Sequence, residues 1–359
     1  MRPRSSVALR PWRTLPVYVL SQRGWAASVG VPASRDRSGM KIRAFALVLC
    51  ACRFFAVDVA GAQGTDIQIV APSAPGTGWD HVAQSLRAAM AERGGLAAGV
   101  TNLPGGGGLV GLAQFLASQA DTDLLVTGLT MLDSTLLSRS SPDFRQLTPI
   151  ARLSSDYYAV AVPANSPLKS LHDLGSALVG DPGRLTWGGG PAGGLDHVAA
   201  ILLARAVGLR TEQLNYVPFL SGADGKAAAA EEKVGAVIMA LSELTAEAAA
   251  GRLRILGVSS SERLEGVDAP TLAEAGIPLE FANWRGVAGR PGLPADQQLR
   301  LAALVQAATL SSSWQATLNT RKWNSTFLGP EAFQAFVRQE HQRVKEALHG
   351  AGLLKRRGE

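Results

Sequence analysis

The chain has 359 residues, of which 47% are hydrophobic, enough for one large or two ordinary domains with sizeable cores. Its formal charge of +6 arises in the first 62 residues, which hold ten of the 35 Lys and Arg but only two of the 29 Asp and Glu. The remaining 25 basic and 27 acidic residues nearly balance, so the composition argues against nucleic-acid binding and we expect no nucleic-acid partner.

Residues 40–62 have the pattern of an export signal. Basic residues follow Met40, residues 44–52 form an apolar run too short to span a membrane, and Ala60-Gly61-Ala62 fits the small-residue cleavage rule. We therefore expect a signal peptide at 40–62, a mature chain that starts near Gln63, and a periplasmic location. Residues 1–39 are Arg- and Ser-rich without an apolar face, and we interpret them as a non-native upstream extension. A genuine presequence is the alternative.

Both cysteines, Cys50 and Cys52, fall inside this signal. The mature chain would then have neither a disulfide nor a thiolate metal ligand. A lipid anchor at Cys52 is a minor alternative. No spacing typical of a metal site occurs elsewhere, so we expect no metal and no cofactor. No later segment has 18 consecutive apolar residues, which predicts a soluble mature protein.

After the signal, strand and helix patterns alternate. Predicted strands cover residues 67–71, 99–103, 124–129, 150–153, 158–163, 185–187, 215–219, 234–239 and 255–259. Predicted helices follow most of them, and the C-terminal part is mostly helical, at 294–311, 313–319 and 330–348. Such alternation predicts an α/β fold in which helices cover parallel sheets.

Two glycine-rich turns, each ending in an Asp-His pair, join a strand to a helix. The first is Pro75-Gly76-Thr77-Gly78-Trp79-Asp80-His81, and the second spans residues 188–197 and ends in Asp196-His197. Each turn would present unpaired backbone N–H groups and the positive end of a helix dipole, which suits an anion. We expect Asp80 and Asp196 to cap their helices, which leaves the amides of Thr77 and Gly78 free. His197 could be a structural hydrogen-bonding residue or a functional one.

An enzyme is the main competing interpretation. Residues 106–111 match G-x-G-x-x-G, with Asp133 further on, as in a dinucleotide-binding dehydrogenase. A glycine run matches that motif by default, however, and an exported chain would meet little nicotinamide cofactor. A hydrolase would need a nucleophile elbow, and the candidate serines have no visible activating context: Ser73, Ser221 and Ser242. We predict no catalysis, with a dehydrogenase or hydrolase as the alternative.

The order of the motifs resembles the periplasmic solute-binding proteins of tripartite tricarboxylate transporters, the Bug family. The resemblance covers residues 66–348 and rests on the segments 69–72, 75–80, 102–108, 147–151, 167–171, 216–219, 251–256 and 269–276. Three further segments look most like the tricarboxylate-binding branch: Trp79-Asp80, residues 187–197 and Asn283-Trp284-Arg285-Gly286. Trp79, Trp187 and Trp284 could wall a ligand or belong to the core.

This resemblance implies a two-lobed periplasmic-binding-protein fold (type II, Venus flytrap) with two crossovers. We expect the first lobe at 63–163 plus 285–359, the second at 164–284, and hinges near 163–166 and 281–285. The implied ligand is a di- or tricarboxylate, held by amides and waters rather than by a dedicated arginine. The ligand-binding residues that we expect are Ser73, Gly76, Thr77, Gly78, Trp79, Asp80, Thr130, Met131, Gly189, Gly190, Ala192, Gly193, Gly194, Asp196, His197, Phe219 and Ser242.

The partners implied by the resemblance are a small carboxylate and a membrane transporter with a large and a small subunit. We expect the binding protein to be a monomer. A ligand-sensing partner of a membrane receptor is an alternative that would have the same cleft, so the sequence does not separate the two.

Overall fold

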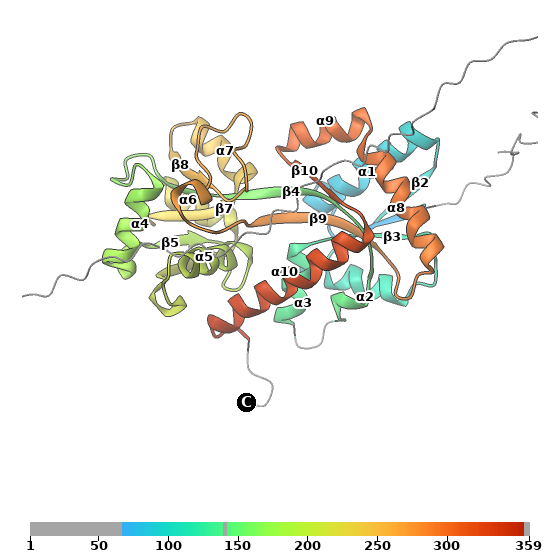
Figure 1. Ribbon diagram of the computed structural model, residues 1–359, viewed down its shortest axis with the longest axis horizontal. Coiled ribbons are helices and arrows are strands. Elements are labelled where there is room, and N and C mark those ends of the chain that lie inside the picture. Colours follow the sequence, from blue (N-terminus) through green and yellow to red (C-terminus); the bar gives the residue numbers. More distant parts are fainter. Residues whose placement is uncertain (1–66, 139–141, 355–359) are drawn as a thin grey trace, which may run out of the picture. The chain divides into compact units, whose positions relative to one another are not determined.

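The computed structural model describes residues 67–138 and 142–354 (Figure 1). The expected upstream extension, signal peptide, cleavage site and both cysteines therefore lie outside the described residues. Within those two ranges, no helix combines the length and the apolar character needed to cross a membrane.

Ten strands form one sheet in the order β2-β1-β3-β9-β4-β7-β5-β6, and β10 and β8 also pair with β4. The part around β1 to β3 is called the first lobe here. Its strands are β1 (Ile67–Ala71), β2 (Ala98–Asn102), β3 (Leu124–Gly128), β9 (Ala282–Gly289) and β10 (Asn324–Leu328). Its helices are α1 (Gly78–Gly94), α2 (Leu109–Ala117), α3 (Leu129–Leu137), α8 (Ala295–Thr309), α9 (Ser312–Arg321) and α10 (Pro330–Gly350).

The second lobe is built around the other end of β4 (Thr148–Pro163). Its further strands are β5 (Trp187–Gly189), β6 (Tyr216–Pro218), β7 (Ala236–Ala240) and β8 (Leu253–Val258). Its helices are α4 (Leu171–Gly180), α5 (Leu195–Ala206), α6 (Gly222–Ala230) and α7 (Leu241–Ala249). In each lobe a parallel strand, β1 or β5, is followed by a turn and then by helix α1 or α5. Figure 1 shows β4 and β9 running between the two lobes.

Strand β4 corrects one sequence prediction. Two strands were expected, at 150–153 and 158–163, because polar residues interrupt the apolar pattern between them. The structure has one continuous strand, and its polar centre of Ser154, Ser155 and Asp156 is buried. Hydrogen bonds between Ser155 and Thr326 at 2.9 Å and between Asp156 and Ser242 at 2.5 Å offset the burial of two of these residues. The buried Ser154 hydroxyl has no hydrogen-bond partner among the described residues.

Two strands cross between the lobes. Strand β4 pairs with β9 up to Tyr157 and with β7 from Tyr158 onward. Strand β9 runs antiparallel beside β4 and brings the chain back to the first lobe, where it also pairs with β3. Strand β4 therefore changes partner between Tyr157 and Tyr158, opposite the point where β9 begins, so both strands cross between the lobes side by side. The lobe boundaries and hinge segments given above stay predictions.

Two expected strand ends are helix starts instead. Thr130 and Met131 lie in the first turn of α3, and Ser242 lies in the first turn of α7, because each helix begins directly after its strand. At the first junction Gly128 makes this possible, since a Cβ there would stand 2.6 Å from the Trp284 carbonyl oxygen. Strand β10 was not predicted at all.

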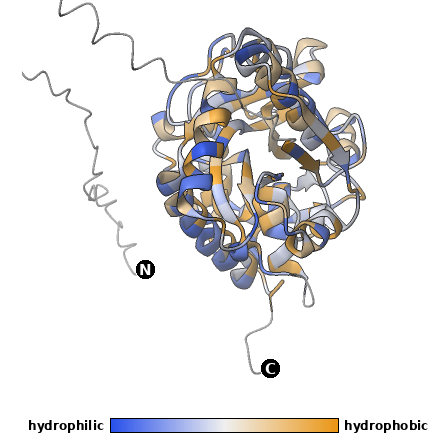
Figure 2. Ribbon diagram, turned by 90° about the vertical axis from the view of Figure 1, so that its right-hand side faces the viewer, coloured by the Kyte–Doolittle hydropathy of each residue, from blue (hydrophilic) through white to orange (hydrophobic). Residues whose placement is uncertain are grey.

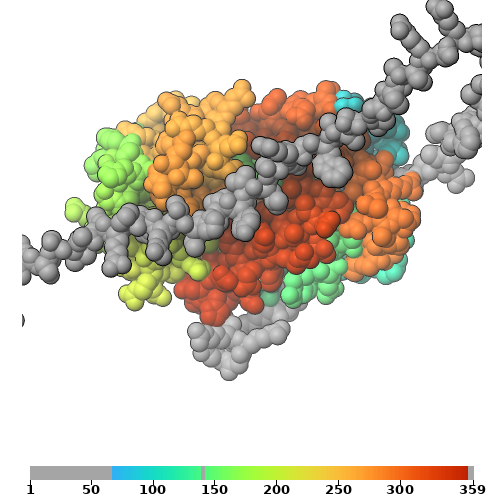
Figure 3. Space-filling view, in the orientation of Figure 1, coloured from blue at the N-terminus to red at the C-terminus, as the bar shows by residue number. Residues whose placement is uncertain are grey.

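The core explains why the lobes form one body. A single cluster of buried residues contains Leu125 from the first lobe, Ile201 and Trp187 from the second, and Val344 from α10. Helix α10 packs against α8 and α5 and so bridges both lobes, which Figure 3 shows as red atoms between orange and yellow-green ones. Hydrophilic residues concentrate on the outer helices (Figure 2).

Candidate functional site

The first glycine turn is held by Asp80, but not in the way that the sequence predicted. Helix α1 begins at Gly78, its N-cap is Thr77, and no side chain caps it. Asp80 lies in the first turn and reaches backward, where its carboxylate accepts the Gly76 N–H at 2.7 Å. Asn102 Nδ2 donates to the same carboxylate at 3.0 Å. Burial opposes ionisation of Asp80, yet these hydrogen bonds hold its pKa below the ordinary value.

The second glycine turn has the same construction. Helix α5 begins at Leu195 without a side-chain cap, and Asp196 in its first turn accepts the Gly190 N–H at 2.9 Å. His197 Nδ1 accepts the Gly193 N–H at 3.0 Å. The His197 ring stacks on Tyr216, with ring centres 4.2 Å apart, and burial lowers the pKa of His197. These contacts favour the structural role for His197 over the functional one.

Each aspartate therefore fixes its turn instead of capping its helix. The expectation of helix capping by Asp80 and Asp196 was wrong because each carboxylate satisfies a glycine amide four or six residues earlier. The amide of Thr77 is also bonded, to the Ala74 carbonyl. The first N–H groups of a helix have no partner within it. Among the described residues, the structure shows no other acceptor for the amides of Gly78 or Leu195.

Arg285, on strand β9, was not among the predicted ligand residues. It belongs to β9 at the level where that strand leaves the second lobe, opposite Ser154 of β4. Its guanidinium stands over the Trp323 ring at 4.1 Å. Nε and Nη2 are both 3.8 Å from the point where a Cβ on Gly78 would stand. The guanidinium therefore borders the first turn.

This arginine is buried without a carboxylate partner. Only 8% of Arg285 is exposed, and within the described residues no carboxylate oxygen comes within 4.0 Å of it. Its guanidinium donates a long hydrogen bond, from Nη1 to the Asn283 carbonyl at 3.4 Å. Burial lowers the pKa of Arg285, and the charge of Asp156 opposes that effect. A buried cation that lacks a counter-ion is costly, which suits a site that receives an anion.

Three acids line the opposite side of the site. Asp156 of β4 accepts the Ser242 hydroxyl at 2.5 Å, and burial raises its pKa. Burial raises the pKa of Asp196 to about 6. Glu243 is exposed, but desolvation of its carboxylate by the surrounding protein raises its pKa to about 7. The charge of Arg285 acts on both Asp156 and Glu243.

Gly78 borders Arg285 in the first lobe, and in the second lobe the carboxylates of Glu243 and Asp196 both approach Gly222. A cavity of about 600 Å³ also lies between the lobes. Its lining includes Leu241 and Thr245 of α7 from the second lobe and Trp323 from the first. Trp323 thus connects this cavity with the arginine that stands over its ring.

The remaining predicted residues differ in how they could meet a ligand. Ser73 accepts the Thr77 hydroxyl at 2.6 Å, so these two side chains stabilise the first turn. Met131 is fully buried, whereas Thr130 is partly accessible. In the second lobe, the partly accessible residues are Gly194, Asp196, His197, Phe219 and Ser242. Ala192 is exposed. The buried residues are Gly189, Gly190 and Gly193.

The tryptophans separate into two groups. Trp187 and Trp284 are at most 1% exposed and belong to the core, which settles the alternative that was open for them. Trp79 is partly buried, and its ring lies about 3 Å from the point where a Cβ on Gly108 would stand. The absence of a side chain at Gly108 therefore lets the Trp79 ring pack against the glycine run at 106–108.

The dinucleotide alternative finds no support in this packing. A Cβ on Gly107 would stand 2.1 Å from Ser134 Oγ, so the run is pressed against α3 rather than open to a pyrophosphate. Asp133, the proposed ribose-binding acid, is buried in α3, and burial raises its pKa to about 8. Across the described ranges, no group of three or more His, Cys, Asp or Glu is arranged to hold a metal ion.

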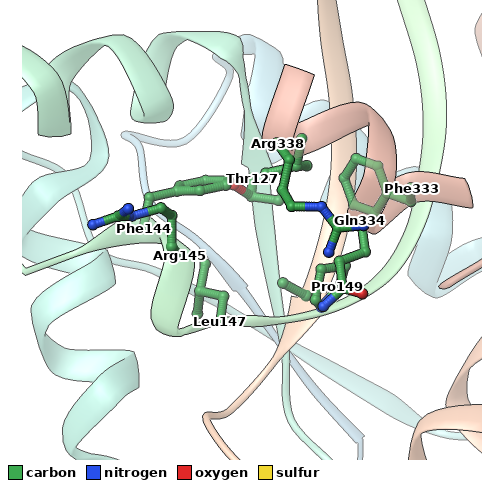
Figure 4. A pocket seen from close by; sticks show the side chains of 10 residues that line it. Thr127, Phe144, Arg145, Leu147, Pro149, Phe333, Gln334 and Arg338 are labelled. Carbon is green, nitrogen blue, oxygen red and sulfur yellow. The ribbon is translucent and has the colours of Figure 1, made fainter. Parts of the chain in front are cut away.

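A separate pocket of about 190 Å³ lies between Phe144 and helix α10, far along the chain from the glycine turns. Figure 4 shows Phe144 and Phe333 on opposite sides of it. Arg145 at its edge pairs with Asp143 at 2.7 Å. This pocket is mostly apolar and has none of the residues that the two turns contribute.

Known proteins match the chain over most of its length. Residues 82–353 match the TctC family model, described as tripartite tricarboxylate transporter family receptor. A TctC solute-binding protein from Polaromonas is 24% identical, with a TM-score of 0.71 over 79% of this chain and 97% of that protein. MatC from Rhodopseudomonas palustris, solved with bound malate, is 22% identical, with a TM-score of 0.60 over 79% and 98%. A further R. palustris protein, solved with adipate, is 24% identical, with a TM-score of 0.62 over 80% and 97%. These similarities confirm the two-lobed solute-binding fold.

Proposed function

The chain belongs to the tripartite tricarboxylate transporter receptor family, and from this premise we propose that it captures a small di- or tricarboxylate between its lobes. Arg285 carries the proposal. Its guanidinium is buried, lacks a carboxylate partner within the described residues, and borders the first glycine turn. A ligand carboxylate on Nε and Nη2 would supply the missing counter-charge through paired hydrogen bonds.

The glycine turns support this arrangement. Asp80 and Asp196 hold the loops from behind, so the free amides at the starts of α1 and α5 stay oriented before a ligand arrives. Preorganised donors lose little entropy on binding. The dipoles of both helices favour a negative charge at their first turns. This proposal departs from the sequence-based expectation, which had amides and waters hold the ligand rather than a dedicated arginine.

Two relatives of the same fold are known with dicarboxylates, malate in MatC and adipate in the second R. palustris protein. By analogy, the lobes of this chain would close about β4 and β9 and bury the acid. The loaded protein would deliver it in the periplasm to the large and small subunits of a membrane transporter. In this proposal the protein acts as a monomer and catalyses no reaction.

Isothermal titration calorimetry of the purified protein against malate, adipate and citrate tests the proposal. We expect at least one acid to bind with a dissociation constant of about 1 μM or lower, equivalent to roughly −8 kcal/mol. Arg285→Gln should weaken that binding by about 30-fold or more, and Arg145→Gln, outside the site, should leave it unchanged. Absence of binding by every acid, or full affinity in Arg285→Gln, would contradict the proposal.

A further inference from the structure

The pocket between Phe144 and helix α10 combines an apolar interior with a basic rim. Its volume is about 190 Å³. The apolar residues that line it come from the segment 144–149, from β9 and from α10: Phe144, Leu147, Pro149, Ala288, Phe333 and Val337. The other lining residues are polar or basic, and none of them is an acid. This space is called the α10 pocket here.

Aromatic packing holds the walls of the α10 pocket in place. Phe144 and Phe333 lie on opposite sides of it (Figure 4). Both rings pack edge-on against Trp284, with ring centres 6.4 and 5.6 Å apart. All three side chains are at most 4% exposed. The pocket therefore exists before a ligand arrives, as is usual for small-molecule sites.

The volume of the α10 pocket suits one aromatic ring with a small substituent. An apolar cavity of about 150 Å³ in an unrelated protein holds benzene, so a space of about 190 Å³ leaves room for one further group. Water gains little in such a space, because an apolar lining offers it few hydrogen-bond partners. Entry of an apolar ring is therefore favourable.

The rim of the α10 pocket carries one uncompensated positive charge. Arg145 pairs with Asp143 at 2.7 Å, and its guanidinium points away from Arg338 in Figure 4. Arg338 is exposed on α10 and extends toward Pro149 (Figure 4). Within residues 67–138 and 142–354 it forms no ion pair, and its guanidinium donates no hydrogen bond. An anion at the mouth of the pocket would supply the missing partner.

We propose that the α10 pocket is a second binding site, for a small monocarboxylate with an apolar ring, about the size of benzoate. The ring lies between Phe144 and Phe333, and the carboxylate accepts hydrogen bonds from Arg338 and from the Gln334 amide at the rim. A dicarboxylate is excluded, because its second charge would enter the apolar interior without a partner. The site does not use Arg285 and is independent of the proposed function.

Titration of the purified protein with benzoate, followed by the NMR signals of the ligand, tests this site. We expect a dissociation constant of about 0.1 to 1 mM, as suits so small a ligand. Benzamide has nearly the same shape but no charge, and it should bind about tenfold more weakly. The Arg285→Gln variant should bind benzoate as the parent does, because that residue does not line the α10 pocket.

Two variants separate the charge from the cavity. Arg338→Gln should weaken benzoate about tenfold and leave benzamide unchanged, and Arg87→Gln, at another exposed arginine on α1, should change neither. Val337→Phe places a ring inside the pocket and should remove the binding of both ligands. Thermal unfolding checks that this variant is folded. Arg338 is exposed, so its replacement leaves the fold intact and decides the outcome on its own.

Three results would overturn the proposal. The first is no binding of benzoate at millimolar concentration. The second is equal affinity for benzoate and benzamide, or full benzoate affinity in Arg338→Gln. The third is loss of benzoate binding in Arg285→Gln, or its persistence in folded Val337→Phe, since either would place the acid elsewhere. Dicarboxylate titrations report on Arg285 alone, so the proposed function and this second site can fail separately.

Discussion

The guanidinium carbon of Arg285 lies 4.1 Å from the centre of the Trp323 ring. The ring comes from the junction of α9 and β10, and the arginine comes from the crossover strand β9. A flat aromatic face restricts the guanidinium without neutralising it. The contact therefore holds a buried positive charge beside the start of α1, while Nε and Nη2 have no partner in the part of the chain that the structure describes.

Replacement of Arg285 should affect binding and stability in opposite ways. In Arg285→Gln we expect carboxylate affinity to fall by about 30-fold or more, because charge-assisted paired hydrogen bonds are lost. The unliganded protein should be equally stable or more stable, because removal of a buried charge that has no counter-ion relieves a desolvation cost. Calorimetry and urea unfolding measure the two effects. A large loss of stability would point to a structural role instead.

Removal of the Asp80 carboxylate should loosen the first turn. Asp80→Ala leaves the Gly76 N–H and the Asn102 amide without their acceptor, and we expect a loss of about 2–3 kcal/mol in the free energy of unfolding. Because the folded pKa of Asp80 is lowered, this stabilisation is present at neutral pH and disappears as the pH falls below the ordinary value of 3.8. Urea unfolding measures it, with exposed Asp181→Ala as the control. Equal stability of the two variants would contradict this role.

Helix α6 should tolerate no side chain where it meets β5. A Cβ on Gly225 would stand 2.6 Å from both the nitrogen and the Cα of Gly189, and backbone atoms cannot move aside easily. We expect Gly225→Ala to destabilise the protein by about 1–3 kcal/mol. Gly175→Ala in α4 is the matched control, since its Cβ would meet nothing within 4 Å and should stabilise the helix by up to about 1 kcal/mol. Thermal unfolding distinguishes them, and similar melting temperatures would refute the contrast.

The acids of the second lobe should make the unliganded protein less stable as the pH rises. The folded protein raises the pKa of Asp196 to about 6 and that of Glu243 to about 7, above their ordinary values of 3.8 and 4.5. Between these limits the folded state holds more protons than the unfolded state, so stability decreases from about pH 4 to about pH 7.

The double variant Asp196→Asn with Glu243→Gln should lose less stability over that interval than the parent. Thermal unfolding across the pH range measures the difference, at about 2–4 °C for each kcal/mol in a protein of this size class. Both new side chains retain an oxygen that can accept a hydrogen bond, so the Gly190 contact can persist. Parallel pH profiles for parent and variant would show that these two acids do not titrate as described.

Local patterns were sufficient for the fold class and for the position of both turns. Glycines between an apolar strand and an alanine-rich helix predict a strand-turn-helix unit wherever the unit lies in space, and both units are present. The ordered motifs also identified the family, which the match over residues 82–353 confirms. The polar centre of β4 misled the strand prediction because burial between two lobes is not a property of that segment alone.

The sequence by itself determined that two anion-compatible helix starts exist, because backbone conformation there depends on glycines and aspartates only a few residues apart. Tertiary structure alone decided which charges accompany them. Arg285, Trp323 and Glu243 come from separate parts of the chain, and only the two crossover strands bring them beside the turns. Desolvation then makes it costly to keep Arg285 charged without a counter-ion, and it raises the pKa of the acids. Desolvation depends on the whole surrounding protein rather than on neighbours in sequence.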